Sequence, residues 1–150
     1  MNSGAAQAWF IAGTIPFIVG GGAHVLATLL DTVRPTFFTP IDASAKPAVE
    51  GTGIRLVRMF GVSGTRPSMW RVWLGMNVSH GLGVFTFGLL CLLIASHDFT
   101  LVERIDAIRP VTIAFSAAYV ALSLRFWFYG ALIISGRATA CFTVAAVLSA

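Results

Sequence analysis

Long apolar runs alternate with polar connections along the chain. The first run extends from Ala8 to Leu30 and the second from Val72 to Ser96, and a histidine is the only ionisable residue in each. About 20 residues, rising 1.5 Å each, are enough to cross the hydrocarbon core of a bilayer. The pattern therefore predicts membrane-spanning helices over residues 8–30 and 72–96.

The last apolar stretch, residues 110–150, contains only two charged residues, Arg125 and Arg137. A single helix of this length would be roughly twice as long as the bilayer core is thick. We therefore expect two helices, over residues 107–128 and 131–150.

These two helices require a tight turn near Tyr129 and Gly130, and both arginines would lie close enough to it for their long side chains to reach the membrane surface. The predicted fold class is thus all-α. It is an integral membrane bundle of four transmembrane helices, which we expect to form a single domain over residues 1–150.

The connection between the first two helices, residues 31–71, has a different character. Four of the six prolines interrupt it, which excludes a long helix. In its middle, apolar and basic side chains alternate at roughly helical spacing, which predicts a short basic segment lying on the membrane surface. The residues concerned are Val49, Leu56, Met59 and Phe60 with Arg55 and Arg58.

Composition supports a membrane protein. Hydrophobic residues make up 57% of the chain and charged residues only 11%, with a mean hydropathy of +0.84. A soluble domain carries about 25% charged residues, so a soluble enzyme and a disordered chain are both excluded. The net charge of +4 comes largely from residues 34–71, a pattern that favours anionic lipid headgroups over nucleic acid.

The basic residues also predict an orientation. Eight of the ten Lys and Arg residues lie in or beside the first and third connections. Because positive charge accumulates on the cytoplasmic side, the connection over residues 31–71 is expected in the cytoplasm. The chain would then be a multi-pass protein of the plasma membrane, the inner membrane of a bacterium, with both termini outside the cytoplasm.

Polar residues inside the predicted helices gather in the cytoplasmic half, within about 14 Å of the helix ends. On the second helix they follow one face together with two tryptophans, and the third helix repeats the pattern. Polar groups avoid lipid, so these faces should enclose a polar-walled cavity. Its candidate ligand-binding residues are Trp70, Trp73, Asn77, Tyr119 and Ser123, and its candidates for proton transfer are His80 and His24.

Alternatives remain for these residues. Serine and threonine hydroxyls in membrane helices often bond their own backbone, tryptophans often anchor at the interface, and the histidines could be structural hydrogen-bonding groups. Two histidines without a nearby acid fall short of a metal site, so no metal and no cofactor are predicted. The cysteines, Cys91 and Cys141, are expected to be free thiols that pack as apolar groups.

The segment Met69–Gly83, MWRVWLGMNVSHGLG, resembles the MWRxWxGxNxSHxLG signature of a family of small uncharacterised four-helix bacterial membrane proteins. The segments FFTP at 37–40, RFWF at 125–128 and ATACF at 138–142 are similar to other parts of that family. The family often has proline where Ala131 stands and an apolar residue where Arg137 stands. The resemblance implies a four-helix fold and no particular activity.

Three functions follow as hypotheses. The first is binding of a hydrophobic lipid- or isoprenoid-like small molecule in the cavity, with membrane lipids as further partners. The second is an intramembrane acid–base enzyme, of isomerase or cyclase type, acting on such a substrate. The third is a non-catalytic accessory subunit, or a homo-oligomer, that associates through close-packing glycine faces. Those faces comprise Gly81, Gly83 and Gly88, and Gly136 with Ala140.

Overall fold

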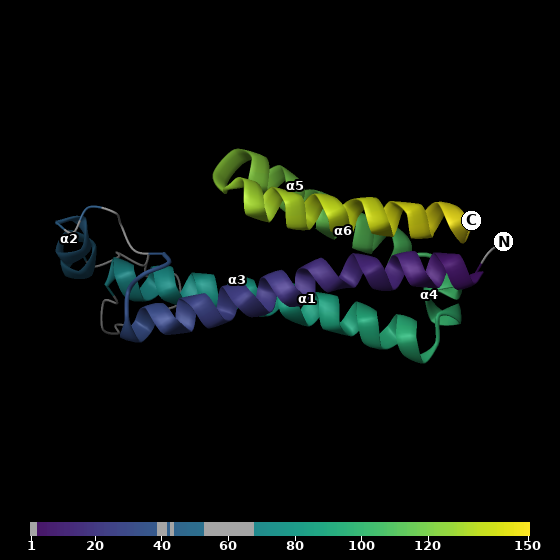
Figure 1. The fold of residues 1–150 in the computed structure, drawn as a ribbon, viewed down its shortest axis with the longest axis horizontal. Coiled ribbons are helices and arrows are strands. Elements are labelled where there is room, and N and C mark those ends of the chain that lie inside the picture. The colour runs from purple at the N-terminus through teal and green to yellow at the C-terminus, as the bar shows by residue number, and fades with distance from the viewer. Residues whose placement is uncertain (1–2, 39–41, 43, 53–67) are drawn as a thin grey trace, which may run out of the picture. The chain divides into compact units, whose positions relative to one another are not determined.

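The computed structural model describes residues 3–38, 42, 44–52 and 68–150, and every element in these ranges is a helix. The all-α prediction is therefore confirmed. Four long helices are joined by two short ones (Figure 1). They are α1 (Ser3–Val33), α2 (Ala45–Gly51), α3 (Met69–His97), α4 (Thr100–Arg104), α5 (Ile108–Phe126) and α6 (Tyr129–Leu148).

Three of the described helices, α1, α3 and α6, are long and apolar enough to cross a membrane. The prediction of a protein with transmembrane helices is confirmed to that extent. Helix α5 is less apolar because Arg109 and Arg125 lie near its ends and its buried face carries Thr112, Ser116 and Ser123. The fourth span stays a prediction.

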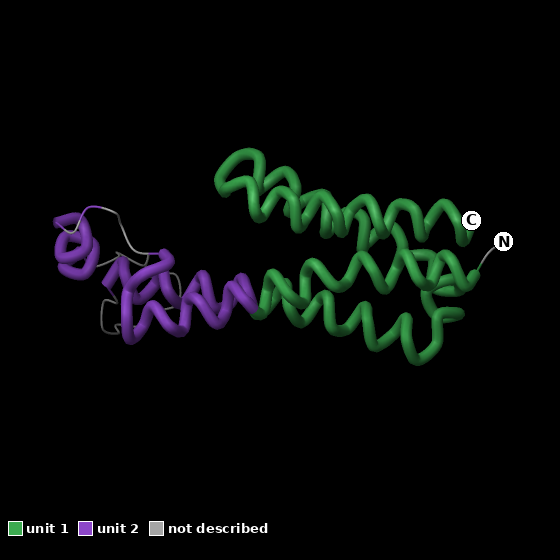
Figure 2. The backbone as a smooth tube through the Cα atoms, in the orientation of Figure 1, with its two compact units in different colours: residues 1–22, 82–150 green, residues 23–81 purple. Residues whose placement is uncertain are grey.

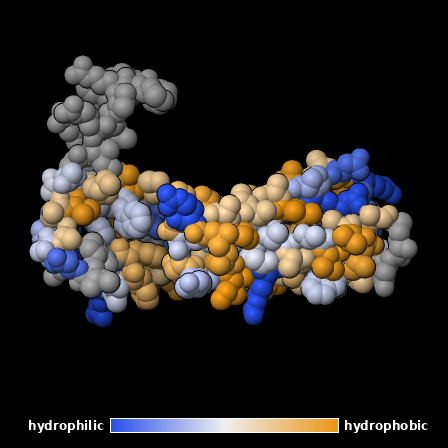
Figure 3. Space-filling model, turned by 90° about the horizontal axis from the view of Figure 1, so that it is seen from above, coloured by the Kyte–Doolittle hydropathy of each residue, from blue (hydrophilic) through white to orange (hydrophobic). Residues whose placement is uncertain are grey.

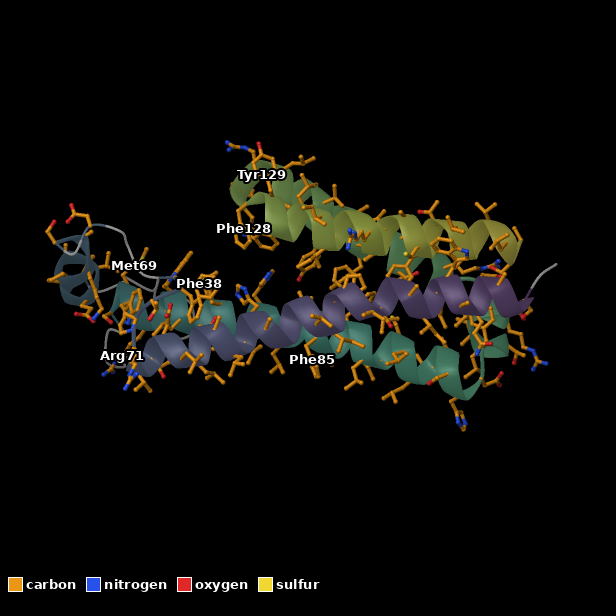
Figure 4. The ribbon with its side chains drawn as sticks, viewed as in Figure 1. Phe38, Met69, Arg71, Phe85, Phe128 and Tyr129 are labelled. Atoms are coloured by element: carbon orange, nitrogen blue, oxygen red, sulfur yellow. The ribbon has the colours of Figure 1, made fainter. Side chains whose placement is uncertain are left out.

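The turn between the last two helices has two residues, as expected, but begins two residues earlier than expected. Only Trp127 and Phe128 separate α5 from α6, and both adopt extended backbone angles that reverse the chain. Figure 4 labels Phe128 and Tyr129 at this reversal. Val49 of the predicted surface segment lies in α2, and the rest of that segment, residues 55–60, lies outside the described residues. In the same connection, α2 is stabilised by an ion pair of 3.1 Å between Lys46 and Glu50.

The chain divides into two compact units (Figure 2), and the single membrane domain over residues 1–150 stays a prediction. Unit 1 comprises Met1–Gly22 and Leu82–Ala150, and unit 2 comprises Ala23–Gly81, so α1 and α3 contribute to both.

Aromatic rings form the core of unit 1. Phe10 and Phe142 meet edge to face with ring centroids 5.1 Å apart, and Phe17 meets Phe115 in the same way at 5.8 Å. Such pairs add roughly 0.5–1.5 kcal/mol beyond the burial of their area. These rings tie α1 to α5 and α6.

Polar side chains join the helix ends at one end of unit 1. The Ser3 hydroxyl donates to the Glu103 carboxylate at 2.9 Å, and the Arg109 guanidinium donates to the Ser149 carbonyl at 3.1 Å. The start of α1, helix α4, the start of α5 and the end of α6 therefore lie together (Figure 1). On the face drawn in Figure 3, hydrophobic residues cover wide areas of the surface between the charged and polar side chains.

Some glycines permit close helix packing and others face open space. A Cβ atom on Gly88 of α3 would lie 3.0 Å from Phe17 Cβ and from Ile18 Cγ1, both on α1. A Cβ atom on Gly83 or Gly136 would meet no atom of the described residues within 4 Å. Of the four glycines expected at packing faces, Gly81 and Gly88 are thus in close contact, and the other two are open.

Asp98, just beyond α3, offers a test of pH dependence. Its carboxylate accepts hydrogen bonds from the Thr100 hydroxyl at 2.7 Å and from the Thr100 N–H at 3.0 Å. These two bonds hold the pKa of Asp98 below its ordinary value, and the bond from the Thr100 hydroxyl contributes most. Their stabilising contribution is therefore present at neutral pH and is lost as the pH falls through the lowered pKa.

We expect Thr100→Val to raise the pKa of Asp98 toward its ordinary value, as measured by NMR titration of the carboxyl carbon in micelles. Thr143→Val is the control, because the Thr143 hydroxyl bonds only the carbonyl of Thr139 in its own helix. An unchanged Asp98 pKa in Thr100→Val would contradict the assignment.

Candidate functional site

Two histidines from different helices meet in unit 2. His24 on α1 and His80 on α3 are partly buried, and their rings meet edge to face with centroids 5.3 Å apart. Gly81 permits this approach, because a Cβ atom there would lie 2.9 Å from His24 Cδ2 and 2.9 Å from Val25 Cγ2. Sequence and geometry together thus place two imidazoles side by side on helices that are apolar enough to span a membrane.

Asn77 orients the His24 ring. The Asn77 Nδ2 group donates to the Trp73 carbonyl one turn earlier at 2.9 Å, which turns its Oδ1 atom toward His24 Nε2 at 3.1 Å. An amide oxygen only accepts, so His24 Nε2 must carry the proton and donate it. In the neutral imidazole, Nδ1 then has a free lone pair. That atom has no hydrogen-bond partner among the residues that the structure describes.

A buried carboxylate shapes the backbone beside the histidines. Asp31 is 0% exposed in the last turn of α1, and its two oxygens accept the N–H groups of three successive residues. Oδ1 accepts from Thr36 at 2.7 Å and from Phe37 at 2.8 Å, and Oδ2 accepts from Phe38 at 2.6 Å. Successive N–H groups of this kind form a site for an anion, which Asp31 fills. The segment after α1 is thereby folded back on the helix.

This folded segment places an aromatic ring against His24. The Phe38 and His24 ring centroids are 4.8 Å apart, and Trp73 Nε1 donates to the Phe38 carbonyl at 3.3 Å. Figure 4 labels Phe38 beside the first half of α3. Asp31, Phe38 and Trp73 therefore determine the wall of the histidine site.

Sequence reasoning did not identify Asp31 or Phe38 as site residues. Asp31 was assigned to the connection, whereas the structure places it inside α1. A signal was present, because a carboxylate at the end of an apolar helix precedes a proline and a short polar and aromatic segment. Asp commonly bonds nearby backbone N–H groups at such positions.

Trp70 belongs to a different part of unit 2. It is buried, and Lys46 Nζ of α2 lies 5.9 Å from its ring centroid. A cavity of about 390 Å³ beside it is lined by Glu50, Ser68, Trp70 and Arg71. Trp70 therefore lines a charged cavity, while Trp73 contributes to the histidine site.

The two predicted site residues of α5 lie in unit 1. The Tyr119 ring packs against Phe115 at 4.9 Å and Phe17 at 5.9 Å between centroids. The Ser123 hydroxyl donates to the Tyr119 carbonyl at 2.7 Å. Ser123 thus follows the structural alternative, a bond to its own helix. The hydroxyls of Ser116, Ser135 and Thr139 also donate to carbonyls of their own helices.

The chemistry available at the histidine site is hydrogen bonding and proton transfer. No cluster of three or more potential metal ligands occurs among the described residues, and Cys91 and Cys141 are free. Comparison with family models, curated proteins and solved structures finds no match for this chain. A functional assignment therefore depends on the geometry of this site.

Proposed function

We propose that the chain is a multi-pass plasma-membrane protein with four spans and both termini outside the cytoplasm. Helix α5 packs against α6, and its 19 residues are about 28 Å long, close to the thickness of the bilayer core. If α6 spans, α5 would return beside it. The Lys and Arg distribution supports the orientation, and the Met69–Gly83 motif supports membership of the four-helix family.

Within this protein, the proposed function is binding of a lipid- or isoprenoid-like molecule at the histidine site formed by His24, Asn77, His80 and Phe38. The observation that carries the proposal is the orientation of His24. Asn77 holds Nε2 as a donor, which leaves Nδ1 as an acceptor with no partner among the described residues. A polar atom in apolar surroundings gains most from a hydrogen-bond partner, so the ligand should carry a hydroxyl or N–H group at its polar end.

The paired imidazoles also favour a second candidate, an intramembrane acid–base enzyme. His24 Nδ1 is placed to accept a proton, and His80, with its ring centroid 5.3 Å away, provides a second titratable group. Two histidines in this arrangement could serve as base and acid in an isomerisation. The same site would then bind the substrate before it is converted.

Native mass spectrometry with lipid analysis of the detergent-purified protein tests the binding proposal. We expect the wild type to retain one defined molecule from the host lipids. His24→Phe keeps an aromatic ring beside Gly81 but removes Nδ1, and Asn77→Leu removes the group that orients His24. Both variants should lose at least about 80% of the retained molecule, since a lost hydrogen bond in an apolar site costs on the order of 1–3 kcal/mol.

Ser79→Ala is the matched control, because Ser79 is exposed on the same helix and its hydroxyl bonds only the carbonyl of Met76. It should retain the molecule as the wild type does. Equal retention in wild type and His24→Phe would overturn the proposal. Conversion of the retained molecule by wild type but not by His80→Ala, with retention unchanged, would establish the enzyme instead.

A further inference from the structure

A second candidate site lies in unit 1, between α1 and α6. This Arg137 groove has a volume of about 250 Å³ and is lined by Ile15, Pro16, Val19 and Gly20 of α1 and by Ile133, Ile134 and Arg137 of α6. Gly20 contributes no side chain, and a Cβ atom there would approach Ile134 Cδ1 to 3.2 Å. The absence of that side chain keeps the groove open at a point where the two helices are close.

One charged group stands in this apolar lining. Arg137 is exposed and, across the described part of the chain, makes no hydrogen bond or ion pair. It lies eight residues after Tyr129, roughly 12 Å along the axis of α6, and that helix contains no acidic residue. An arginine at such a depth in a bilayer is costly unless its donors find acceptors.

The groove and the charge together indicate the chemistry of an occupant. Aliphatic walls favour a hydrocarbon chain, and a guanidinium favours the oxygens of a phosphate, which it can bind with two parallel hydrogen bonds. Helical side chains lean toward the N-terminus of their helix, so Arg137 reaches toward Ile133 and Ile134 and toward the Tyr129 end. The hydrocarbon chain of the occupant would then pack against the apolar wall at Ile15 and Pro16.

We propose that the Arg137 groove binds one acyl chain of an anionic phospholipid and that the lipid phosphate pairs with the Arg137 guanidinium. Free phosphate could use the charge but not the apolar walls. A lipid without net charge could use the walls but would gain less from the guanidinium. This site is independent of the histidine site, which lies in unit 2 and requires a ligand that donates a hydrogen bond.

The test is native mass spectrometry of the full chain in detergent, titrated with phosphatidylglycerol, with phosphatidylcholine of the same chains, or with inorganic phosphate. The wild type should bind phosphatidylglycerol in preference to the other two. Arg137→Gln should weaken phosphatidylglycerol binding about five- to tenfold, as expected for one basic side chain, and should weaken phosphatidylcholine binding less. Because Arg137 is exposed, this variant should fold normally.

Arg125→Gln is the matched control, because this substitution removes the same charge outside the groove. Arg125 lies on α5, with its guanidinium against the Phe126 ring. A second pair tests the walls: Ile133→Asn should weaken phosphatidylglycerol binding, and Val147→Asn, exposed elsewhere on α6, should not. Equal binding by wild type and Arg137→Gln would overturn the proposal. So would an equal loss in Arg125→Gln, or displacement of the lipid by equimolar inorganic phosphate.

Discussion

Asp31→Ala is expected to lower the free energy of unfolding by about 2–3 kcal/mol, because three backbone N–H groups lose a charged acceptor at once. Thr36 and Phe37 are exposed, so water replaces part of what is lost. Asp31→Asn keeps one acceptor oxygen and should have about half the effect. Titration of the protein with SDS in micelles measures both free energies.

The lower stability of Asp31→Ala should be accompanied by local loosening of the segment after α1. Amide hydrogen exchange at residues 36–38 should accelerate in Asp31→Ala while exchange in the middle of α5 stays slow. Asp42→Ala is the control, since Asp42 is exposed and its carboxylate also accepts a backbone N–H, that of Ser44. Equal and small effects of the two alanine variants would show that Asp31 does not hold the segment after α1.

Asp31 also connects stability with the proposed function. The segment that it holds carries Phe38, which packs on His24, and the Phe38 carbonyl accepts from Trp73. Asp31→Asn should therefore reduce retention of the ligand at the histidine site even where the protein stays folded. Phospholipid binding at the Arg137 groove should be unaffected, since none of these residues belongs to unit 1.

Gly88→Ala is expected to lower stability, and Gly83→Ala to leave it unchanged or raise it. At Gly88 the new methyl group would lie 3.0 Å from Phe17 Cβ and Ile18 Cγ1 and 3.1 Å from the Ile18 backbone nitrogen. Backbone cannot move aside as a flexible side chain can, so the helices must separate. Overpacking of this kind costs about 1–3 kcal/mol.

At Gly83 the methyl group meets no atom of the described residues within 4 Å. Alanine favours a helix over glycine by about 1 kcal/mol, so Gly83→Ala should leave stability unchanged or raise it. The same SDS titration measures the free energy of unfolding of both variants, whose substituted residues lie five positions apart on one helix. A destabilisation by Gly83→Ala as large as that by Gly88→Ala would contradict this packing. It would instead favour an open glycine face that associates with another chain.

Much of the fold could be predicted because hydrophobicity acts locally. The apolar runs around His24 and His80 are long enough to span, and the structure places α1 and α3 over both. The turn before α6 was placed slightly late, because the extended backbone of Trp127 and Phe128 has no glycine or proline signal of its own. Helix α5 is less apolar than α1, α3 and α6. The residues responsible, above all Arg109 and Arg125, are visible in the sequence.

The candidate site could be predicted only in part. Spacing placed Trp73, Asn77 and His80 on one face of a helix, and helical periodicity is enough for such an inference. It could not identify which hydroxyls would turn back to their own helix, as the Ser123 hydroxyl does. Nor could it show that Trp70 would face Lys46, because that depends on how α2 folds against α3.

The sequence by itself determined the all-α class, the four long helices and the positions of polar groups along them, because each depends on residue type and on neighbours within a few turns. Only the tertiary structure decided that Asp31 is buried, that Phe38 covers His24, and that Asn77 leaves His24 Nδ1 as an acceptor. These features depend on contacts between residues as many as 53 positions apart. No local pattern encodes the distance at which two helices pack.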